Sequence, residues 1–252
     1  MVLYRARNSY TLSRESSEHR IAIVVDFLLS LTSVPINATP SAAQWWATID
    51  RSYLSKAATT APSPNATRVI LAKQTDDDQY SLGKSLTLVE VFQLAAGLGF
   101  CSARCGLHGS DARAGYAYAW AGNADRECPG HCAWPFAKPE YGPQDPAQAL
   151  PLVPPNGDAG VDGMVVTLAS MVAGAVTNPF GDGFYLGDKD AALEACTACA
   201  GKFGAGAYPG YPGKVIVDET TGGSYNAVGA NGRKYLLPAI LDPATSSCST
   251  LV

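Results

Sequence analysis

The apolar positions recur at helical spacing in four stretches of the chain. These stretches are predicted as helices and cover Arg20–Leu31, Ala42–Leu54, Thr87–Ala96 and Met164–Val176. Ser41 stands at the N-cap position of the second helix, in which Trp45, Trp46 and Ile49 are expected to face the core. The last helix is apolar enough to be buried. Asn178-Pro179 should end it, because proline cannot continue a helix.

Short runs rich in β-branched and aromatic residues predict strands, most of them in the last quarter of the chain. The predicted strands cover Val69–Ala72, Tyr116–Trp120, Lys214–Asp218, Ser224–Val228 and Tyr235–Leu241. Thr220–Gly223 has the composition of a hairpin turn, and Asn231-Gly232 supplies the next turn. The order of these elements predicts a mixed α/β fold without internal repeats.

Composition excludes several classes of protein. Of the 252 residues, 47% are hydrophobic and 16% are charged, so the chain can form a packed core and is not a disordered chain. Its net charge of −4 provides no basic field that would hold nucleic acid or an anionic membrane surface. The 25 glycines and 17 prolines indicate a loop-rich globular protein.

Signals for cellular location conflict. Residues 1–20 lack the apolar segment of a signal peptide, which taken alone predicts a cytosolic chain. The longest apolar-rich run, Gly163–Gly181, is interrupted by Asn178-Pro179, so no membrane span is predicted. In contrast, Asn65 begins an N-x-T glycosylation sequon, and the scattered cysteines favour an oxidising secretory route.

The seven cysteines leave three interpretations open: disulfides, a zinc site or unpaired thiols. They are Cys101, Cys105, Cys128, Cys132, Cys196, Cys199 and Cys248. Four of them, together with His108 and His131, form a cluster of soft ligands that could hold a tetrahedral zinc ion. The C-x3-C spacing differs from the usual C-x2-C of zinc knuckles, and the chain otherwise resembles a secreted one. Disulfides are therefore favoured over zinc, although spacing does not give their pairing.

Catalytic motifs are incomplete. Gly83-Lys84-Ser85 would end a P-loop, but Asp78 replaces its first glycine and would repel phosphate. The string Gly222–Asn226 lacks the last glycine of G-x-S-x-G, and its base would have to be His108 or His131. A carboxylate pair for hydrolysis could come from the loop aspartates, which more often form Asx-turns. These are Asp158, Asp162, Asp182 and Asp188.

Aromatic strings offer a further interpretation. Trp134-Pro135-Phe136 and Tyr208–Gly213 could form platforms on which sugars stack, if their rings are exposed. The favoured interpretation is a set of rigid turns whose rings cover the edge of the core. A carbohydrate-binding module using Trp134, Tyr208 and Tyr211 thus stays as an alternative.

Several strings together resemble the plant exordium, or phosphate-induced protein, family. The strings are FCSARCGLHG from Phe100, CPGHCAWPF from Cys128, DGM from Asp162, TNPFG from Thr177, TGGSYN from Thr221, NGRKYLLP from Asn231 and the terminal CSTLV from Cys248. Trp45-Trp46 and Tyr80–Thr87 also fit the family. The resemblance covers most of the chain from about residue 20. It implies a single domain over residues 20–252, preceded by an atypical segment, residues 1–19.

The resemblance also implies a function and a fold. It implies a non-enzymatic, secreted protein of the cell wall or apoplast that promotes cell expansion and is linked to the brassinosteroid response. No cofactor is implied, and the partner would be an unknown component of the wall or cell surface. Family members look like degenerate zincins, in which the metal-binding positions of the zincin helix fall on Ser170, Met171 and Gly174. None of these residues can bind zinc.

Three departures from the family stand out. The usual signal peptide and first strand are replaced by a polar start, and some twenty family residues between Ala96 and Gly99 are missing. Cys196 is additional, which leaves the six family cysteines as disulfide candidates: Cys101, Cys105, Cys128, Cys132, Cys199 and Cys248. The alternatives to the growth-related function are a secreted hydrolase acting around His108 and Asp182, and the carbohydrate-binding module.

Overall fold

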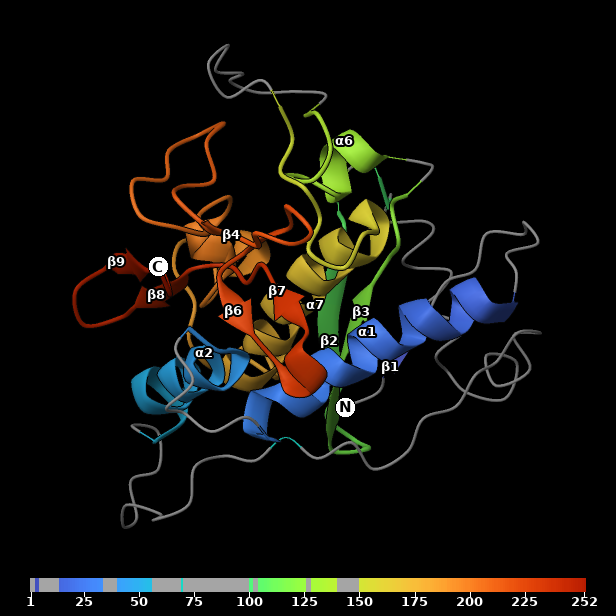
Figure 1. Cartoon of the computed structure of the whole chain (residues 1–252). Helices are drawn as coiled ribbons and strands as arrows, with labels where there is room; N and C mark the ends of the chain where they lie inside the picture. The colour runs from blue at the N-terminus through green and yellow to red at the C-terminus, as the bar shows by residue number, and fades with distance from the viewer. Residues whose placement is uncertain are drawn as a thin grey trace.

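The computed structural model describes residues 3–4, 14–33, 40–55, 69, 100–101, 104–125, 128–139 and 150–252 (Figure 1). The predicted helix Thr87–Ala96, the P-loop-like string around Gly83 and the sequon at Asn65 lie outside the described residues. Of the predicted strand Val69–Ala72, only Val69 is described, and it is not part of a strand.

Two helices in the first quarter of the chain confirm the predicted ones. α1 spans Arg14–Ser33 and begins before the predicted boundary at residue 20. α2 spans Ala42–Ile49 and continues into a π-helical turn, η1, over Asp50–Leu54. The Oγ atom of Ser41 accepts a hydrogen bond from the backbone N–H of Gln44 at 3.1 Å, as an N-cap does. Trp45, Trp46 and Ile49 are buried, as predicted.

Three strands form a small sheet. β2 (Gly106–Asp111) and β3 (Tyr116–Ala121) pair antiparallel, and β1 (Leu3–Tyr4) adds to β3 in parallel, in the order β1-β3-β2. The strand predicted at Tyr116–Trp120 is therefore confirmed. Leu107 of β2 lies opposite Trp120 of β3, which is buried.

α7 (Ala159–Thr177) is the central helix, and it packs against β2, β3 and α1 (Figure 1). Asp158 caps its start and Asn178 its end, so it begins before the predicted Met164. Asp162 was expected in a loop; that expectation was wrong, because Asp162 lies in the first turn of this helix. α7 is long and apolar enough to span a membrane, yet most of it is buried inside the fold, as in a core helix of a globular protein.

The last quarter of the chain is built from short two-stranded ladders instead of the longer strands predicted. The pairs are β4 (Ile216–Val217) with β5 (Ser224–Tyr225), β6 (Ala227–Val228) with β7 (Lys234–Tyr235), and β8 (Ile240–Asp242) with β9 (Ser247–Ser249). The predicted hairpin is confirmed as β4–β5, but the second half of its second strand pairs with β7. Short helical turns fill the connections: η3 (Lys189–Ala191), η4 (Thr197–Cys199) and η5 (Ala230–Gly232).

Six of the seven cysteines pair in three disulfides. Cys101 pairs with Cys128, Cys105 with Cys132, and Cys199 with Cys248. The first two bonds join the chain before β2 to the short helix α6 (Pro129–Cys132), and the third joins η4 to β9. Cys196 is free and buried in the main core, and burial raises the pKa of its thiol.

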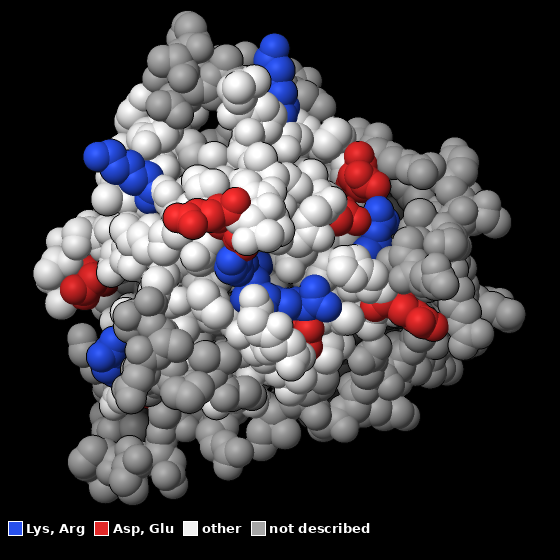
Figure 2. All heavy atoms as spheres, viewed as in Figure 1, with Lys and Arg blue, Asp and Glu red and all other residues white. Residues whose placement is uncertain are grey.

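The main core contains side chains from α1, α2, α7 and the last quarter of the chain, so distant parts of the sequence fold around α7. Charged side chains of both signs are scattered over the face seen in Figure 2, without a basic patch among the described residues there. The mixed α/β class and the presence of disulfides are confirmed.

Candidate functional site

A buried polar cluster lies at the C-terminal end of α7. It joins His108 of β2, Asn178 at the C-cap of α7, and Glu194 from the loop that precedes η4. The Nε2 atom of His108 is 2.6 Å from Oε2 of Glu194, and Nδ2 of Asn178 donates a hydrogen bond to Oε1 of Glu194 at 2.8 Å. The side chains of His108 and Glu194 are only 14% and 9% exposed. Both carboxylate oxygens therefore have a partner.

Neighbouring loops hold the cluster in place. The backbone N–H of Gly183 donates to Oδ1 of Asn178 at 2.8 Å, and the N–H of Glu194 donates to Oγ1 of Thr197 at 2.7 Å. In contrast, Nδ1 of His108 is buried without a hydrogen-bond partner among the described residues. The loops thus fix the side chain of Asn178 and the backbone of Glu194, and one ring nitrogen of His108 makes no hydrogen bond to the described residues.

Gly174 of α7 is in contact with this cluster. A Cβ atom at position 174 would lie 2.3 Å from Oε2 of Glu194 and 2.6 Å from Nε2 of His108. The His108–Glu194 pair thus occupies the space where a larger residue would project from the helix. The other two positions implied as former metal ligands have ordinary helix roles: the hydroxyl of Ser170 donates to the carbonyl of Val166, and Met171 packs against the core.

His108 and Glu194 are of the types that serve as a general base and its orienting carboxylate, but both side chains are largely buried. A histidine held by a carboxylate is typical of catalytic dyads, which need access to substrate. Asp182, the other residue nominated for hydrolysis, lies exposed in the loop after α7. The arrangement is suited to hold β2, the end of α7 and the loop at Glu194 together.

The other nominated aspartates have structural partners. Asp158 accepts a hydrogen bond from the N–H of Val161 at 3.0 Å and forms an ion pair with Arg20 of α1 at 2.7 Å. Asp188 accepts from the N–H of Asp190 at 3.0 Å, an Asx-turn of the kind expected for loop aspartates.

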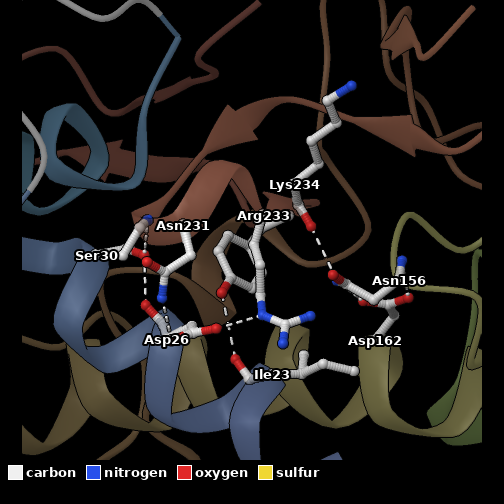
Figure 3. Close-up of polar contacts among 10 residues, drawn as sticks. Ile23, Asp26, Ser30, Asn156, Asp162, Asn231, Arg233 and Lys234 are labelled. Carbon is white, nitrogen blue, oxygen red and sulfur yellow. Dashed lines mark hydrogen bonds and ion pairs between the residues drawn. The ribbon is translucent and has the colours of Figure 1, made fainter. Parts of the chain in front are cut away.

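Asp162 belongs to a second polar network (Figure 3). Asn156 donates to both oxygens of its carboxyl group, from the backbone N–H at 2.9 Å and from Nδ2 at 2.7 Å. The same Nδ2 group also donates to the carbonyl of Lys234 at 2.9 Å. Asn156 therefore bridges α7 to β7.

The network continues on the α1 side of the same segment. Figure 3 shows Arg233 and Asn231 reaching the carboxylate of Asp26, to which Arg233 is ion-paired and Asn231 donates at 3.0 Å. The hydroxyl of Ser30 accepts from the N–H of Ala230 at 2.7 Å. Residues 230–234 are thus held between α1 and α7 by polar side chains.

The carboxyl group of Asp162 is buried, which is unusual for an aspartate. It is 3% exposed, and burial raises its pKa to about 7. The hydrogen bonds from Asn156 and the charge of Arg233 lower the pKa, while Asp158 raises it further. Burial outweighs the hydrogen bonds, so this carboxyl group titrates near neutrality.

The remaining nominated residues are mostly structural. Ser224 of the hydrolase-like string is buried in β5, and Asn226 donates from Nδ2 to the carbonyls of Phe203 and Leu237 at 2.8 Å. Trp134 packs on Phe203 with ring centroids 5.9 Å apart, as expected for a ring that covers the edge of the core.

The tyrosine string is more open. Tyr208 is 46% exposed, and its ring centroid lies 5.0 Å from that of Tyr211 across a tight turn. This pair is the part of the proposed sugar platform that the structure leaves accessible, whereas Phe136 is buried.

Sequence reasoning nominated His108 but missed Glu194 and Asn156. Glu194 follows a loop leucine and belongs to no motif, and Asn156 lies in a proline-rich stretch. Asn178 was identified only as a helix stop. The sequence did hold one signal for these partners: Asn178 and Gly174 lie at one end of an otherwise apolar helix. A polar side chain such as Asn178 in that buried position needs a polar partner from another part of the chain.

Comparisons with known proteins place the chain among relatives of one family. A family model described as "Phosphate-induced protein 1 conserved region" matches residues 15–99 and 95–251, in two segments that overlap at residues 95–99. The chain is 50% identical to Protein PHOSPHATE-INDUCED 1 of Nicotiana tabacum, over 92% of this chain and 79% of that protein. It is 48% identical to Protein EXORDIUM of Arabidopsis thaliana, over 92% of this chain and 80% of that protein.

A third relative, Protein EXORDIUM-like 1 of Arabidopsis thaliana, is 48% identical over 91% of this chain and 81% of that protein. No solved structure matches the chain. The family model covers nearly all of the sequence, and the relatives align along most of their own length. The chain therefore belongs to the phosphate-induced protein 1 family, whose members include the Exordium proteins.

Proposed function

We propose that this chain is a non-enzymatic, extracellular protein of the plant cell wall or apoplast that promotes cell expansion and growth within the brassinosteroid response. The observation that carries the extracellular placement is the set of three disulfides, since such bonds persist in oxidising compartments. The growth-related function rests on membership of the family. The proposal includes a glycan at Asn65, which lies outside the described residues.

The absence of catalysis is supported by how the candidate groups are used. His108 and Glu194 are buried partners of each other, Ser224 is buried, and Asp158 caps a helix. We further propose that the fold is a degenerate relative of the zincins, in which the His108–Glu194 pair fills the space beside Gly174. Such a helix keeps its role in the core without a metal.

The proposal is tested by producing the tagged chain in growing seedlings and measuring both its location and the length of hypocotyl cells. We expect the protein in the apoplastic wash fluid and longer cells than in untransformed seedlings. The matched variant is His108→Gln, which can still donate to Glu194 but cannot act as a base. Its folding is checked by circular dichroism, and it should retain the effect on cell length.

Two results would contradict the proposal. Retention of the whole protein inside cells would oppose the extracellular placement. Loss of the growth effect in a folded and exported His108→Gln protein would oppose the non-enzymatic function and favour the hydrolase.

A further inference from the structure

The two disulfides at α6 share one compact cluster. Cys101–Cys128 and Cys105–Cys132 each join residues 27 positions apart, and Cys128 and Cys132 are buried. The partly buried ring of Phe100 packs against them. Two parallel links therefore connect the same two short segments, and opening one of them leaves the other in place.

His131 places an imidazole beside one of these links. It lies next to Cys132 on α6 and is exposed. A ring nitrogen of His131 and the sulfur atoms of Cys105 and Cys132 all lie within 4.8 Å of one another. Zinc binds thiolate sulfur at about 2.3 Å and imidazole nitrogen at about 2.0 Å, so the ligand atoms of a tetrahedral site lie roughly 3.5 Å apart. The three atoms need only small movements to reach that geometry.

We propose that Cys105, His131 and Cys132 form a redox-gated zinc site, occupied when the Cys105–Cys132 disulfide is reduced. A dithiol reductant is oxidised to its own disulfide and transfers two electrons and two protons to the Cys105–Cys132 bond, giving two thiols. Zinc then displaces both thiol protons and binds two thiolates, the imidazole and a water molecule. The ion replaces the covalent link between the same two segments.

The surrounding structure keeps the ligands together without the disulfide. The carbonyl of Cys105 accepts a hydrogen bond from the N–H of Gly122 at 3.1 Å, which anchors it beside β3. On the other side, α6 is docked closely on α7, because a Cβ atom at Gly163 would lie 2.9 Å from the carbonyl oxygen of Cys132. Each segment is therefore positioned by contacts of its own, and reduction leaves a nearly assembled site.

The test uses the whole chain, reduced with a dithiol under anaerobic conditions, freed of reductant and titrated with zinc against a chromophoric chelator. We expect one zinc ion per reduced chain and none in the oxidised protein. Cobalt(II) in the same site should give the absorption of a tetrahedral thiolate complex. His131→Ala should weaken zinc binding at least tenfold. Cys105→Ser combined with Cys132→Ser should abolish it.

The matched control is the pair Cys199→Ser and Cys248→Ser, which removes the distant disulfide and should leave zinc binding intact. Near-ultraviolet circular dichroism separates binding from unfolding, because zinc should keep the reduced chain in its folded spectrum. Three results would overturn the proposal: no zinc bound by the reduced chain, unchanged affinity in His131→Ala, or zinc bound without a folded spectrum.

Discussion

Replacing Gly174 by alanine is expected to lower the free energy of unfolding by roughly 3 kcal/mol. The new methyl group would lie within 2.6 Å of both His108 and Glu194, so one of the buried partners has to move. Moving either one breaks the 2.6 Å contact between Nε2 of His108 and Oε2 of Glu194 and leaves a buried carboxylate incompletely paired. Alanine favours helices over glycine by about 1 kcal/mol, which offsets only part of this loss.

Urea unfolding of the purified variants measures this effect. The matched control is Ser170→Ala, one turn earlier on the same helix, where the lost hydroxyl donates to the carbonyl of Val166 within that helix. It should change stability by less than about 0.5 kcal/mol. In a His108→Ala background, Gly174→Ala should cost less, because the imidazole is no longer there to clash. A Gly174→Ala protein as stable as the parent would show that the cluster is not packed against α7.

The free energy of unfolding should also fall as pH rises, because the carboxyl group of Asp162 has a raised pKa in the folded chain. Its carboxyl pKa is about 7 in the folded chain, whereas an aspartate exposed to water has an ordinary pKa of 3.8. Between these two values the folded chain retains a proton that the unfolded chain has lost, so the folded state is favoured at low pH and this advantage disappears as pH rises through the folded pKa. The contribution of Asp162 should drop by about 2.5 kcal/mol between about pH 5 and about pH 8.

The measurement compares urea unfolding at the two pH values for the parent and for Asp162→Asn. The asparagine does not titrate, so the variant should lack this part of the pH dependence. Asp182→Asn removes a carboxylate from an exposed loop and should leave the dependence as it is in the parent. An Asp162→Asn protein with the full dependence of the parent would show that other groups cause it.

The sequence predicted secondary structure best where a periodic pattern of hydrophobic residues extends over many positions. α1, α2 and β3 lie where the pattern predicted them, and Ser41 caps α2 through its hydroxyl. The start of α7 was misread because Gly160 and Gly163 resemble a loop. These glycines allow close contact instead, since a Cβ atom at Gly160 would lie 2.4 Å from Asn123 and one at Gly163 would lie 2.7 Å from Ala133. That error placed Asp162 in a loop.

The last quarter of the chain and the site were less predictable for a different reason. Asn226 interrupts the predicted strand, and its side chain makes hydrogen bonds with the backbone of Phe203 and Leu237 that a longer ladder would otherwise supply. His108 and Glu194 are 86 residues apart in the sequence, and no local sequence pattern predicts their contact. The spacing of residues along the sequence identified candidate side chains such as His108. The residues that these side chains contact depend on how the chain folds around α7.

The most direct test of the central claim, an extracellular protein held by three disulfides, is a count of free thiols in protein recovered from plant cells. Thiols are alkylated at harvest, before lysis, and the denatured chain is analysed by mass spectrometry. We predict one alkylated cysteine, Cys196, and six cysteines in the pairs Cys101–Cys128, Cys105–Cys132 and Cys199–Cys248. Seven alkylated cysteines would contradict the account, because the chain would then reside in a reducing compartment.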